Sequence, residues 1–404
     1  MDTARCPFTL DPTGTDLHGE AAALRARAPA TPILLPGNVP AWSVTRAEHI
    51  RRLAADSRVS RDPRRHWPAL NDLPEHWPLN VWVKVTSAFT AYGDEHRRLR
   101  RLIAGAFTPR RTEALRPAVR ATVTRLIEDL SLVEPGRTID LRTRFTYMIP
   151  TEVISDLFGV PQHMRAEARR VIDAALATAA DPEQAGRDYA DLWACMAALV
   201  AHKREAPGQD MTTDLIRARD GESRLTEDEL ISTLILMIGA GSETTVNLIG
   251  HAVVALLTHP DQHAMVRQGR ISWDTVIEET LRWQGPIMHM PLRYAVEDID
   301  LDGVTIPKGD AILLAFGAAG RDPDLHDHPA TFDLTRSNPG DHTAFGHGAH
   351  YCPGAPLARM EAAIALPALF ARFPRLALAT DPDLLVPQES FIANGHRELP
   401  VTLH

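Results

Sequence analysis

A single cysteine stands in a glycine-rich stretch directly ahead of a helix-forming run. Residues 344–361 read AFGHGAHYCPGAPLARME. Seven residues fall at the spacing F-G-x-G-x-H-x-C-x-G-x-x-x-x-R: Phe345, Gly346, Gly348, His350, Cys352, Gly354 and Arg359. The glycines allow a tight turn and a close approach of the backbone to a ligand. A thiolate at a helix N-terminus is stabilised by the helix dipole and by free N–H groups. The spacing therefore predicts a cysteine positioned to bind a metal.

Zinc or copper is the first alternative, because His342, His347 and His350 cluster around this cysteine. Zinc sites usually bring a second pair of Cys or His ligands at short spacing. The other cysteines, Cys6 and Cys195, are far away in the sequence. A different metal centre is therefore favoured.

The spacing resembles the haem-binding loop of the cytochromes P450. The resemblance implies that Cys352 is the axial thiolate ligand of haem b iron, and that His350 meets a haem propionate. Phe345, Gly346 and Gly354 would contact the same cofactor. A thiolate ligand pushes electron density onto the iron and favours cleavage of the O–O bond.

A second segment, 240–245, reads AGSETT. It is similar to the oxygen-activating segment of that family, A/G-G-x-D/E-T-T. The resemblance makes Thr244 and Glu243 the catalytic proton-relay pair and places Ala240 beside the haem, while Gly241 would permit a local widening of the helix. The alternative is a threonine bonded to a carbonyl one turn back and a glutamate that faces solvent.

Glu279 and Arg282 stand at the spacing E-x-x-R, which places both on one helical face. Such a pair alone is usually solvated surface. Because it lies between the AGSETT segment and Arg336, it resembles the structural Glu-Arg-Arg triad of the family. A buried ion network of this kind serves conformational specificity more than stability.

His96 and Arg100 are one helical turn apart, and the resemblance assigns them to the haem propionates together with Arg293 and His350. Arginine suits carboxylates because its planar fork binds them in two places. Other arginines nearby are either solvated surface or a basic docking face for an acidic electron donor: Arg97, Arg98, Arg101, Arg110 and Arg111.

Pro353 follows the cysteine and has no N–H to donate to the sulfur. Proline also suits the first position of a helix. We take helix initiation as the reason for this proline, and we expect a more electron-rich thiolate as its consequence.

Helical periodicity is the commonest pattern along the chain. Residues 226–259 form the longest helical run, opened by the capping box of Thr226 and Glu229 and stopped by Pro260. It would be about 50 Å long.

Residues 31–35 and 41–45 predict an edge hairpin, and 299–307 and 311–316 predict strands. Residues 4–17 read as irregular, and 61–90, with three tryptophans, read as a long loop that is either functional or packed onto the core.

Composition limits the classes of function. The chain has 404 residues, of which 44% are hydrophobic and 24% charged, as in ordinary globular proteins. A net charge of -9 argues against nucleic acid as a partner. Three scattered cysteines favour a reducing cytoplasm. The N-terminal residues lack an apolar stretch and the longest apolar run is short, so we expect no signal peptide and no membrane anchor.

The motifs occur in the family's order from about residue 96 to the end. We expect a mainly α fold with a minor β subdomain, the cytochrome P450 prism, as a single domain over residues 1–404. The resemblance implies a monooxygenase that uses O2 and NAD(P)H to hydroxylate a hydrophobic small molecule of natural-product or xenobiotic metabolism. Electrons would come from a separate ferredoxin and ferredoxin reductase, because no flavin domain is fused.

Two alternative functions stay open: oxidative C–C or C–N coupling at the same haem site, and a catalytically silent haem-fold docking module. The Glu243–Thr244 pair argues against the second. Candidate substrate contacts lie before Thr244 on one helical face, after the E-x-x-R helix and near the C-terminus: Leu236, Gly239, Met288, His289, Phe391 and Ile392.

Overall fold

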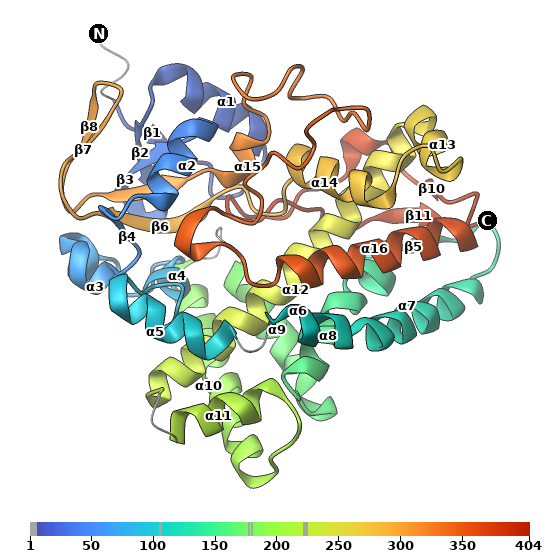
Figure 1. The fold of residues 1–404 in the computed structure, drawn as a ribbon, viewed down its shortest axis with the longest axis horizontal. Coiled ribbons are helices and arrows are strands. Elements are labelled where there is room, and N and C mark those ends of the chain that lie inside the picture. Colours follow the sequence, from blue (N-terminus) through green and yellow to red (C-terminus); the bar gives the residue numbers. More distant parts are fainter. Residues whose placement is uncertain (1–5, 105–106, 177, 179–180, 221–224) are drawn as a thin grey trace.

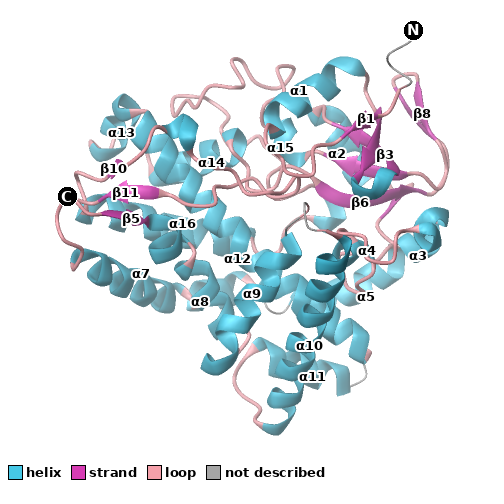
Figure 2. Cartoon of the chain, turned by 180° about the vertical axis from the view of Figure 1, so that it is seen from behind, coloured by secondary structure: helices cyan, strands magenta, loops and turns pink. Residues whose placement is uncertain are grey.

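The computed structural model describes residues 6–104, 107–176, 178, 181–220 and 225–404. Helices dominate this part of the chain, and most strands gather at one side (Figures 1 and 2). The helices have these bounds: α1 (Leu17–Arg27), α2 (Ala47–Ala55), α3 (Pro63–His66), α4 (Asn80–Val83), α5 (Gly93–Ala104), α6 (Pro109–Ala114), α7 (Arg116–Ser131), α8 (Met148–Leu157), α9 (Arg165–Leu176), α10 (Pro182–Glu205), α11 (Met211–Asp220), α12 (Glu227–Thr258), α13 (Pro260–Arg267), α14 (Trp273–Trp283), α15 (Phe316–Ala319) and α16 (Ala355–Arg372).

The strands form one larger sheet and two small ones. The six-stranded sheet has the order β1-β2-β3-β9-β6-β4, a second sheet has the order β10-β11-β5, and β7 pairs with β8. Their bounds are β1 (Phe8–Thr9), β2 (Thr31–Leu35), β3 (Val39–Val44), β4 (Val59–Ser60), β5 (Thr138–Asp140), β6 (Met290–Ala295), β7 (Ile299–Leu301), β8 (Val304–Ile306), β9 (Ala311–Leu314), β10 (Ala377–Leu378) and β11 (Pro400–Thr402). The mainly α fold with a minor β region is confirmed.

Helix α12 crosses the interior of the molecule (Figure 1). The predicted capping box begins it: Thr226 Oγ1 accepts from the Glu229 amide at 3.2 Å, and the Thr226 amide donates to Glu229 Oε2 at 2.8 Å. The helix ends at Thr258, and Pro260 opens α13. Among the described residues, α12 alone is long and apolar enough to span a membrane, but 67% of its most apolar window is buried inside the protein. It is the core helix of this fold.

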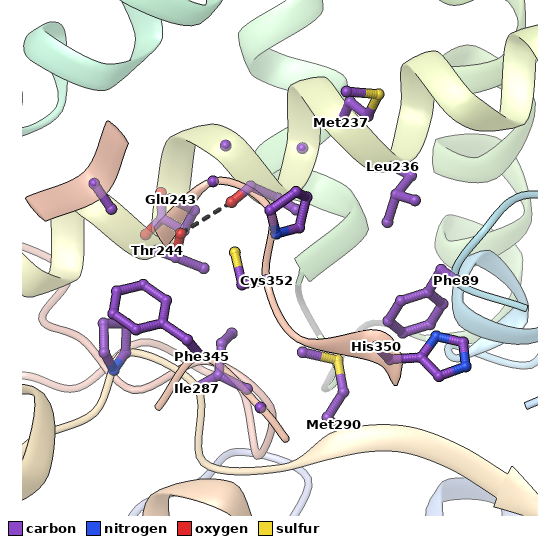
Figure 3. A pocket seen from close by; sticks show the side chains of 18 of the residues that line it. Phe89, Leu236, Met237, Glu243, Thr244, Ile287, Met290, Phe345, His350 and Cys352 are labelled. Atoms are coloured by element: carbon purple, nitrogen blue, oxygen red, sulfur yellow. Dashed lines mark hydrogen bonds between the residues drawn. The ribbon is translucent and has the colours of Figure 1, made fainter. Parts of the chain in front are cut away.

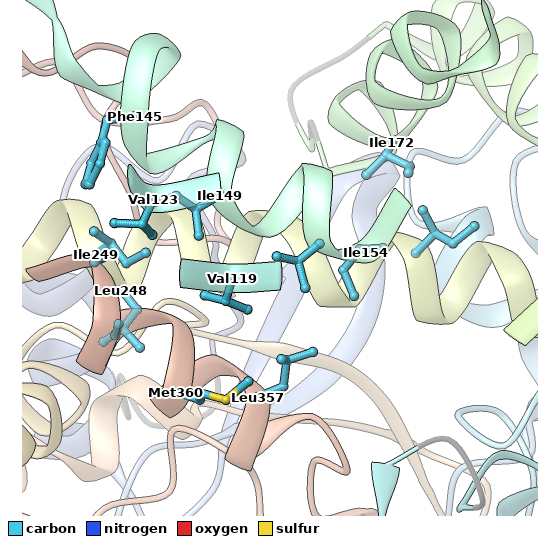
Figure 4. Packing of buried hydrophobic residues seen from close by; sticks show 14 of the residues in the cluster. Val119, Val123, Phe145, Ile149, Ile154, Ile172, Leu248, Ile249, Leu357 and Met360 are labelled. Carbon is cyan, nitrogen blue, oxygen red and sulfur yellow. The ribbon is translucent and has the colours of Figure 1, made fainter. Parts of the chain in front are cut away.

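The main hydrophobic core joins α7, α8, α12 and α16 (Figure 4). Helix α7 shows why these elements pack. Its buried residues Val119, Val123, Leu126 and Leu130 recur every three or four positions and so form one apolar stripe. This packing fixes α12 and the start of α16 relative to each other, and both helices carry predicted site residues.

Gly241 has a different role from the one predicted. The helix is continuous through this residue, without the expected local widening. A Cβ at Gly241 would lie 2.5 Å from Ile154 Cδ1 on α8. The glycine therefore permits the close approach of α8 and α12, a tertiary requirement that the sequence of α12 alone does not contain.

The predicted hairpin of β2 and β3 is present, with Leu35 opposite Val39, but it does not lie at an edge. The strand β1 covers β2, and β9 pairs with β3 in parallel. The prediction that 4–17 is irregular was wrong at two places, because the segment contains β1 and the first residue of α1. Residues 4 and 5 lie outside the described residues. Such short strands form only because a partner strand is already in place.

The region 299–307 is a hairpin of β7 and β8 rather than one strand, with Asp302 and Gly303 at positive φ in its turn. The strand predicted at 311–316 ends at Leu314, and Phe316 begins α15. The expected loop at 61–90 contains the short helices α3 and α4 and a 3-10 turn, Pro68–Asp72. Each of these helices is a single turn, too short for periodicity to reveal.

Candidate functional site

The cysteine loop is held by backbone hydrogen bonds and by glycine geometry. The Cys352 amide donates to the Phe345 carbonyl at 2.9 Å. Gly346 and Gly348 have φ values of 75° and 73°, which favour glycine. A Cβ on Gly348 would lie 2.6 Å from the carbonyl oxygen of Ala54, so the loop can pack this closely on α2 only without a side chain there.

The sulfur of Cys352 lies at the start of α16, as the sequence predicts. The backbone amides of Gly354 and Ala355 donate to it. Burial raises the pKa of the Cys352 thiol, and these amides and the Arg100 and Arg359 guanidinium groups act in the opposite direction. Pro353 therefore does not leave the sulfur without donors, because the next two amides supply them.

Helix α12 faces the cysteine loop across a cavity, and Thr244 lines it (Figure 3). Thr244 Oγ1 donates to the Ala240 carbonyl at 2.9 Å. The threonine therefore makes the hydrogen bond to a carbonyl one turn back that the sequence analysis gave as an alternative. Glu243 does not face solvent, since only 4% of it is exposed. The alternative of a solvent-facing glutamate is therefore wrong.

Glu243 is held by two residues that sequence reasoning missed. Its Oε1 accepts from Arg142 Nη2 at 2.6 Å and from Gln388 Nε2, while its Oε2 has no hydrogen-bond partner. Gln388 in turn accepts from Asn247 Nδ2 at 3.0 Å. Arg142 and Gln388 lie 101 and 145 residues from Glu243 along the chain, so no spacing pattern could have found them.

The four residues predicted to bind propionates come together from separate elements. The rings of His96 on α5 and His350 in the cysteine loop are 4.1 Å apart, and Arg100 Nη2 donates to the Tyr351 carbonyl at 2.6 Å. Burial, with the nearby Arg100 charge, lowers the pKa of His96 to about 4. Burial also lowers the pKa of Arg293 on β6 to about 10.

This group of side chains offers buried hydrogen-bond donors. Arg61, which sequence reasoning did not single out, belongs to it and also lines the cavity. Arg61 Nε, Arg293 Nη1 and His96 Nε2 are buried without hydrogen-bond partners. Within the described ranges, no carboxylate pairs with Arg61, Arg100 or Arg293. Because buried polar groups are normally satisfied, the arrangement fits a cofactor that carries carboxylates into the cavity.

Glu279 and Arg282 form a fully buried ion pair on α14, with Arg282 Nη2 2.7 Å from Glu279 Oε1 and both side chains 0% exposed. Arg336 Nε lies 3.5 Å from Glu279 Oε2. Arg282 also donates to the carbonyls of Gly320, Pro329 and Thr331. The triad thus connects α14 to the long irregular segment that precedes the cysteine loop.

The cavity wall differs from the predicted substrate contacts. Leu236, Gly239 and Ala240 line the cavity. Met288, His289, Phe391 and Ile392 do not. A second hydrophobic cluster, separate from the main core, includes Leu24 on α1 and Ile33 on β2. Met288, Phe391 and Ile392 are buried in this second cluster, and the His289 ring lies 5.9 Å from that of Phe391. Neighbours in each segment take their places: Pro286, Ile287, Met290 and Ala393. Which of two adjacent residues faces inward depends on backbone direction, which composition does not reveal.

The tryptophans of 61–90 divide between the two predicted roles. Trp67 and Trp77 are 5% and 1% exposed and pack in the second cluster. Trp82 lines the cavity together with Phe89. The segment is therefore both a packing element and part of the site.

Apolar side chains make up most of the rest of the cavity wall: Val81, Val85, Ala88, Ile103, Phe107, Ile154, Ile172, Leu192, Ile235, Met237, Leu248, Leu281, Phe316, Ala344 and Leu357. In Figure 3, Leu236 and Met237 lie along α12, while Ile287, Met290 and Phe345 lie on the side of the cysteine loop.

No group of three or more His, Cys, Asp or Glu side chains in the described parts of the chain is arranged to hold a metal ion. A single cysteine, an acid–alcohol pair and buried arginines surround an apolar cavity. These are the parts of a haem-thiolate oxygenase.

Comparison with known proteins agrees with this class. The family model "Cytochrome P450" matches residues 195–269 and 273–394. The 2-hydroxy-5-methyl-1-naphthoate 7-hydroxylase of Streptomyces carzinostaticus is 43% identical, with 98% of each chain covered. The monooxygenase PikC of Streptomyces venezuelae is 39% identical over 98% of this chain and 91% of its own. The structure of CYP154A1 from Streptomyces coelicolor A3(2) has a TM-score of 0.95 at 49% identity, covering 98% of this chain and 100% of that one.

The chain belongs to the cytochrome P450 family. It is an oxidoreductase, a monooxygenase whose cofactor is haem b bound through a thiolate. Its fold is the cytochrome P450 fold.

Proposed function

We propose that this enzyme hydroxylates a hydrophobic natural-product-like small molecule in the cytoplasm, with electrons that pass from NAD(P)H through a ferredoxin reductase and a ferredoxin. One observation carries the proposal. Cys352 and Thr244, from two different elements, line one cavity whose remaining wall is largely apolar.

The residues around the cavity suit the cofactor. Cys352 would be the protein ligand of the iron, and a thiolate-ligated haem, when bound, supplies the chemistry that activates O2 and oxidises a C–H bond. Further residues would hold the cofactor: His96, Arg100, Arg293 and His350 at its carboxylates, and Phe345, Gly346, Gly354 and Ala240 against its faces. Arg293, with an unpartnered buried Nη1, is the strongest support for a carboxylate there.

Thr244 and Glu243 would supply protons on the cavity side of the haem. The Thr244 hydroxyl lines the cavity and holds its proton on the Ala240 carbonyl. Glu243 is held back from it by Arg142 and Gln388. Release of one of these bonds would raise the proton affinity of the carboxylate, so that its free Oε2 could take up a proton from water and pass it toward Thr244.

The cavity wall and the relatives both favour a sizeable apolar substrate. Phe89, Leu236, Ile287 and Met290 contribute apolar surface from four segments. Relatives include hydroxylases named for 2-hydroxy-5-methyl-1-naphthoate, 6-deoxyerythronolide B and vitamin D3. We therefore place the substrate among polycyclic or macrocyclic hydrophobic compounds.

The test uses the purified holoenzyme with a surrogate ferredoxin, its reductase and NADPH. A library of such compounds is first screened for displacement of an iron-bound water by the shift of the haem absorption band. Compounds that bind are then turned over under isotopically labelled dioxygen. Hydroxylation predicts a product with one labelled oxygen atom, whereas a coupled product without label would support C–C or C–N bond formation. A complete absence of NADPH consumption with every bound compound would instead support a silent docking module.

An acidic ferredoxin would dock beside the cysteine loop. A surface hollow there is lined by Ala349 and by residues of α5, four of them arginines: Asp94, Glu95, His96, Arg97, Arg98, Arg100 and Arg101. Asp94 and Glu95 offset part of this charge by pairing with Arg97 and Arg98. Reversal of charge in Arg101→Glu should raise the KM for ferredoxin and weaken its dependence on salt. Equal salt dependence in both proteins would place the donor elsewhere.

A further inference from the structure

Arg61 is the buried cation that the motif-based assignment leaves without a role. It follows β4, whose register places Ser60 opposite Tyr294 and Val59 opposite Ala295. Arg61 therefore continues the strand pairing toward Arg293. The two arginines are 4% and 3% exposed, and both line the cavity together with His350.

Only some of the hydrogen-bond donors of Arg61 have a partner within the protein. Its Nη2 donates to the Pro291 carbonyl at 2.7 Å, and its guanidinium carbon lies 3.5 Å from the centre of the Phe89 ring. Its Nε has no hydrogen-bond partner, and neither does Arg293 Nη1. No carboxylate of the described chain forms an ion pair with either arginine. Two adjacent buried cations without anions are strongly unfavourable, so an anion from outside the chain must neutralise them.

We propose that Arg61 is a further carboxylate-binding residue of the haem site, which works beside Arg293 on the cofactor's propionates. The carboxylate accepts from the free Arg61 Nε, while the Pro291 carbonyl and the Phe89 ring hold the guanidinium in place. Arg293 and His350 line the same cavity as Arg61, and the His96 ring lies 4.1 Å from the His350 ring. Because Arg61 lies among these proposed propionate-binding residues, the cofactor is favoured over the substrate as the source of the carboxylate. This assignment rests on the proposed placement of the propionates at Arg293.

Haem transfer from the holoenzyme to excess apomyoglobin tests the proposal. Loss of one charge-assisted bond predicts transfer about tenfold to a hundredfold faster for Arg61→Met. Arg61→Lys, which keeps the charge but loses the fork, should lie between this variant and the wild type. Arg65→Met is the matched control, because Arg65 is exposed on the same segment and does not line the cavity.

A second readout separates binding from a general loss of structure. The propionate bending mode in the resonance Raman spectrum should shift in Arg61→Met and in Arg293→Met but not in Arg65→Met. An unshifted mode, or haem transfer as slow as in the wild type, overturns the role of Arg61. If Arg293→Met is also silent in both measurements, the proposed propionate placement fails as well.

A substrate carboxylate is the competing source of the anion. The spectral binding of 1-naphthoic acid and of its methyl ester is compared in the wild type and in Arg61→Met. The proposal predicts that any change is the same for acid and ester. Selective weakening of the acid, with haem transfer unchanged, would overturn the proposal and assign Arg61 to the substrate.

Discussion

Cys352 receives two backbone amide bonds at the N-terminus of α16, and it lies in the cavity wall. Replacing it by His should keep a haem-binding fold but abolish the strongly red-shifted absorption band that thiolate ligation gives the reduced carbonyl complex. Absorption spectroscopy of the reduced, carbonyl-treated variant checks this. Retention of that band would mean that another group ligates the iron.

The Thr244 hydroxyl lines the cavity and donates to the Ala240 carbonyl, and we propose that it delivers protons there. Thr244→Ala should still bind substrate and consume NADPH, but it should divert electrons to hydrogen peroxide. The product formed per NADPH should fall steeply, because a positioned proton-transfer group typically contributes about 10²–10⁴-fold.

Ser242 provides the matched control for this experiment. Its hydroxyl donates to the Ile238 carbonyl at 3.0 Å, the same back-bond that Thr244 makes, but it does not line the cavity. Ser242→Ala should leave the product yield nearly unchanged. An equal loss in both variants would show that Thr244 acts only through the geometry of the helix.

Pro353 has no N–H to donate to the Cys352 sulfur, but the amides of Gly354 and Ala355 still donate to it. Pro353→Leu adds an N–H next to the thiolate, and a hydrogen bond to sulfur withdraws electron density and raises the iron potential. We expect a small upward shift, because Gly354 and Ala355 already donate. A redox titration of both proteins without substrate measures it. No shift would mean that Pro353 serves only to begin the helix.

At the scale of elements, the Glu279–Arg282 pair ties α14 to the segment that leads into the cysteine loop. Glu279→Gln removes one charge of a fully buried pair and should lower the free energy of unfolding by about 3–5 kcal/mol. Urea unfolding of the holoenzyme, followed by circular dichroism and by haem absorbance, measures the loss.

The pair of Glu167 and Arg170 on α9 is the control, because it has the same i, i+3 spacing and a distance of 2.7 Å but is half exposed. Glu167→Gln should lower the free energy of unfolding far less, since exposed ion pairs contribute little. Equal losses in the two variants would contradict a special role for the buried triad.

At the scale of the whole molecule, buried neutral histidines couple stability to pH. His289 is fully buried with neither ring nitrogen hydrogen-bonded, and burial lowers its pKa to about 3. The unfolded state takes up the proton near pH 6.5, whereas the folded state does not. The stability that His289 contributes is therefore present above about pH 6.5 and is lost as the pH falls toward 3.

The variant His289→Phe isolates this effect, because all other groups titrate in both proteins. Below about pH 6.5 the wild type should lose about 1.4 kcal/mol per pH unit more than the variant. Urea unfolding of both holoenzymes at a series of pH values measures the difference. Parallel pH profiles would mean that His289 gains a proton in the folded protein.

The parts of the site that the sequence determined are those encoded by local spacing. The cysteine loop depends on glycines whose backbone angles few other residues adopt, and the long helix begins at a capping box whose two members are three positions apart. The pairing of Glu279 with Arg282 follows from one helical turn. These features could be predicted from the sequence because each depends only on residues that lie close together along the chain.

The tertiary structure decided every contact between distant segments. It brought Arg142 and Gln388 to Glu243, placed Arg61 beside Arg293, and used Gly241 for close packing against Ile154 rather than for a wider helix. It also turned Ile287 and Ala393 toward the cavity in place of the residues beside them. These outcomes depend on strand pairing and on the packing of α8 against α12, which join residues that no spacing in the sequence relates.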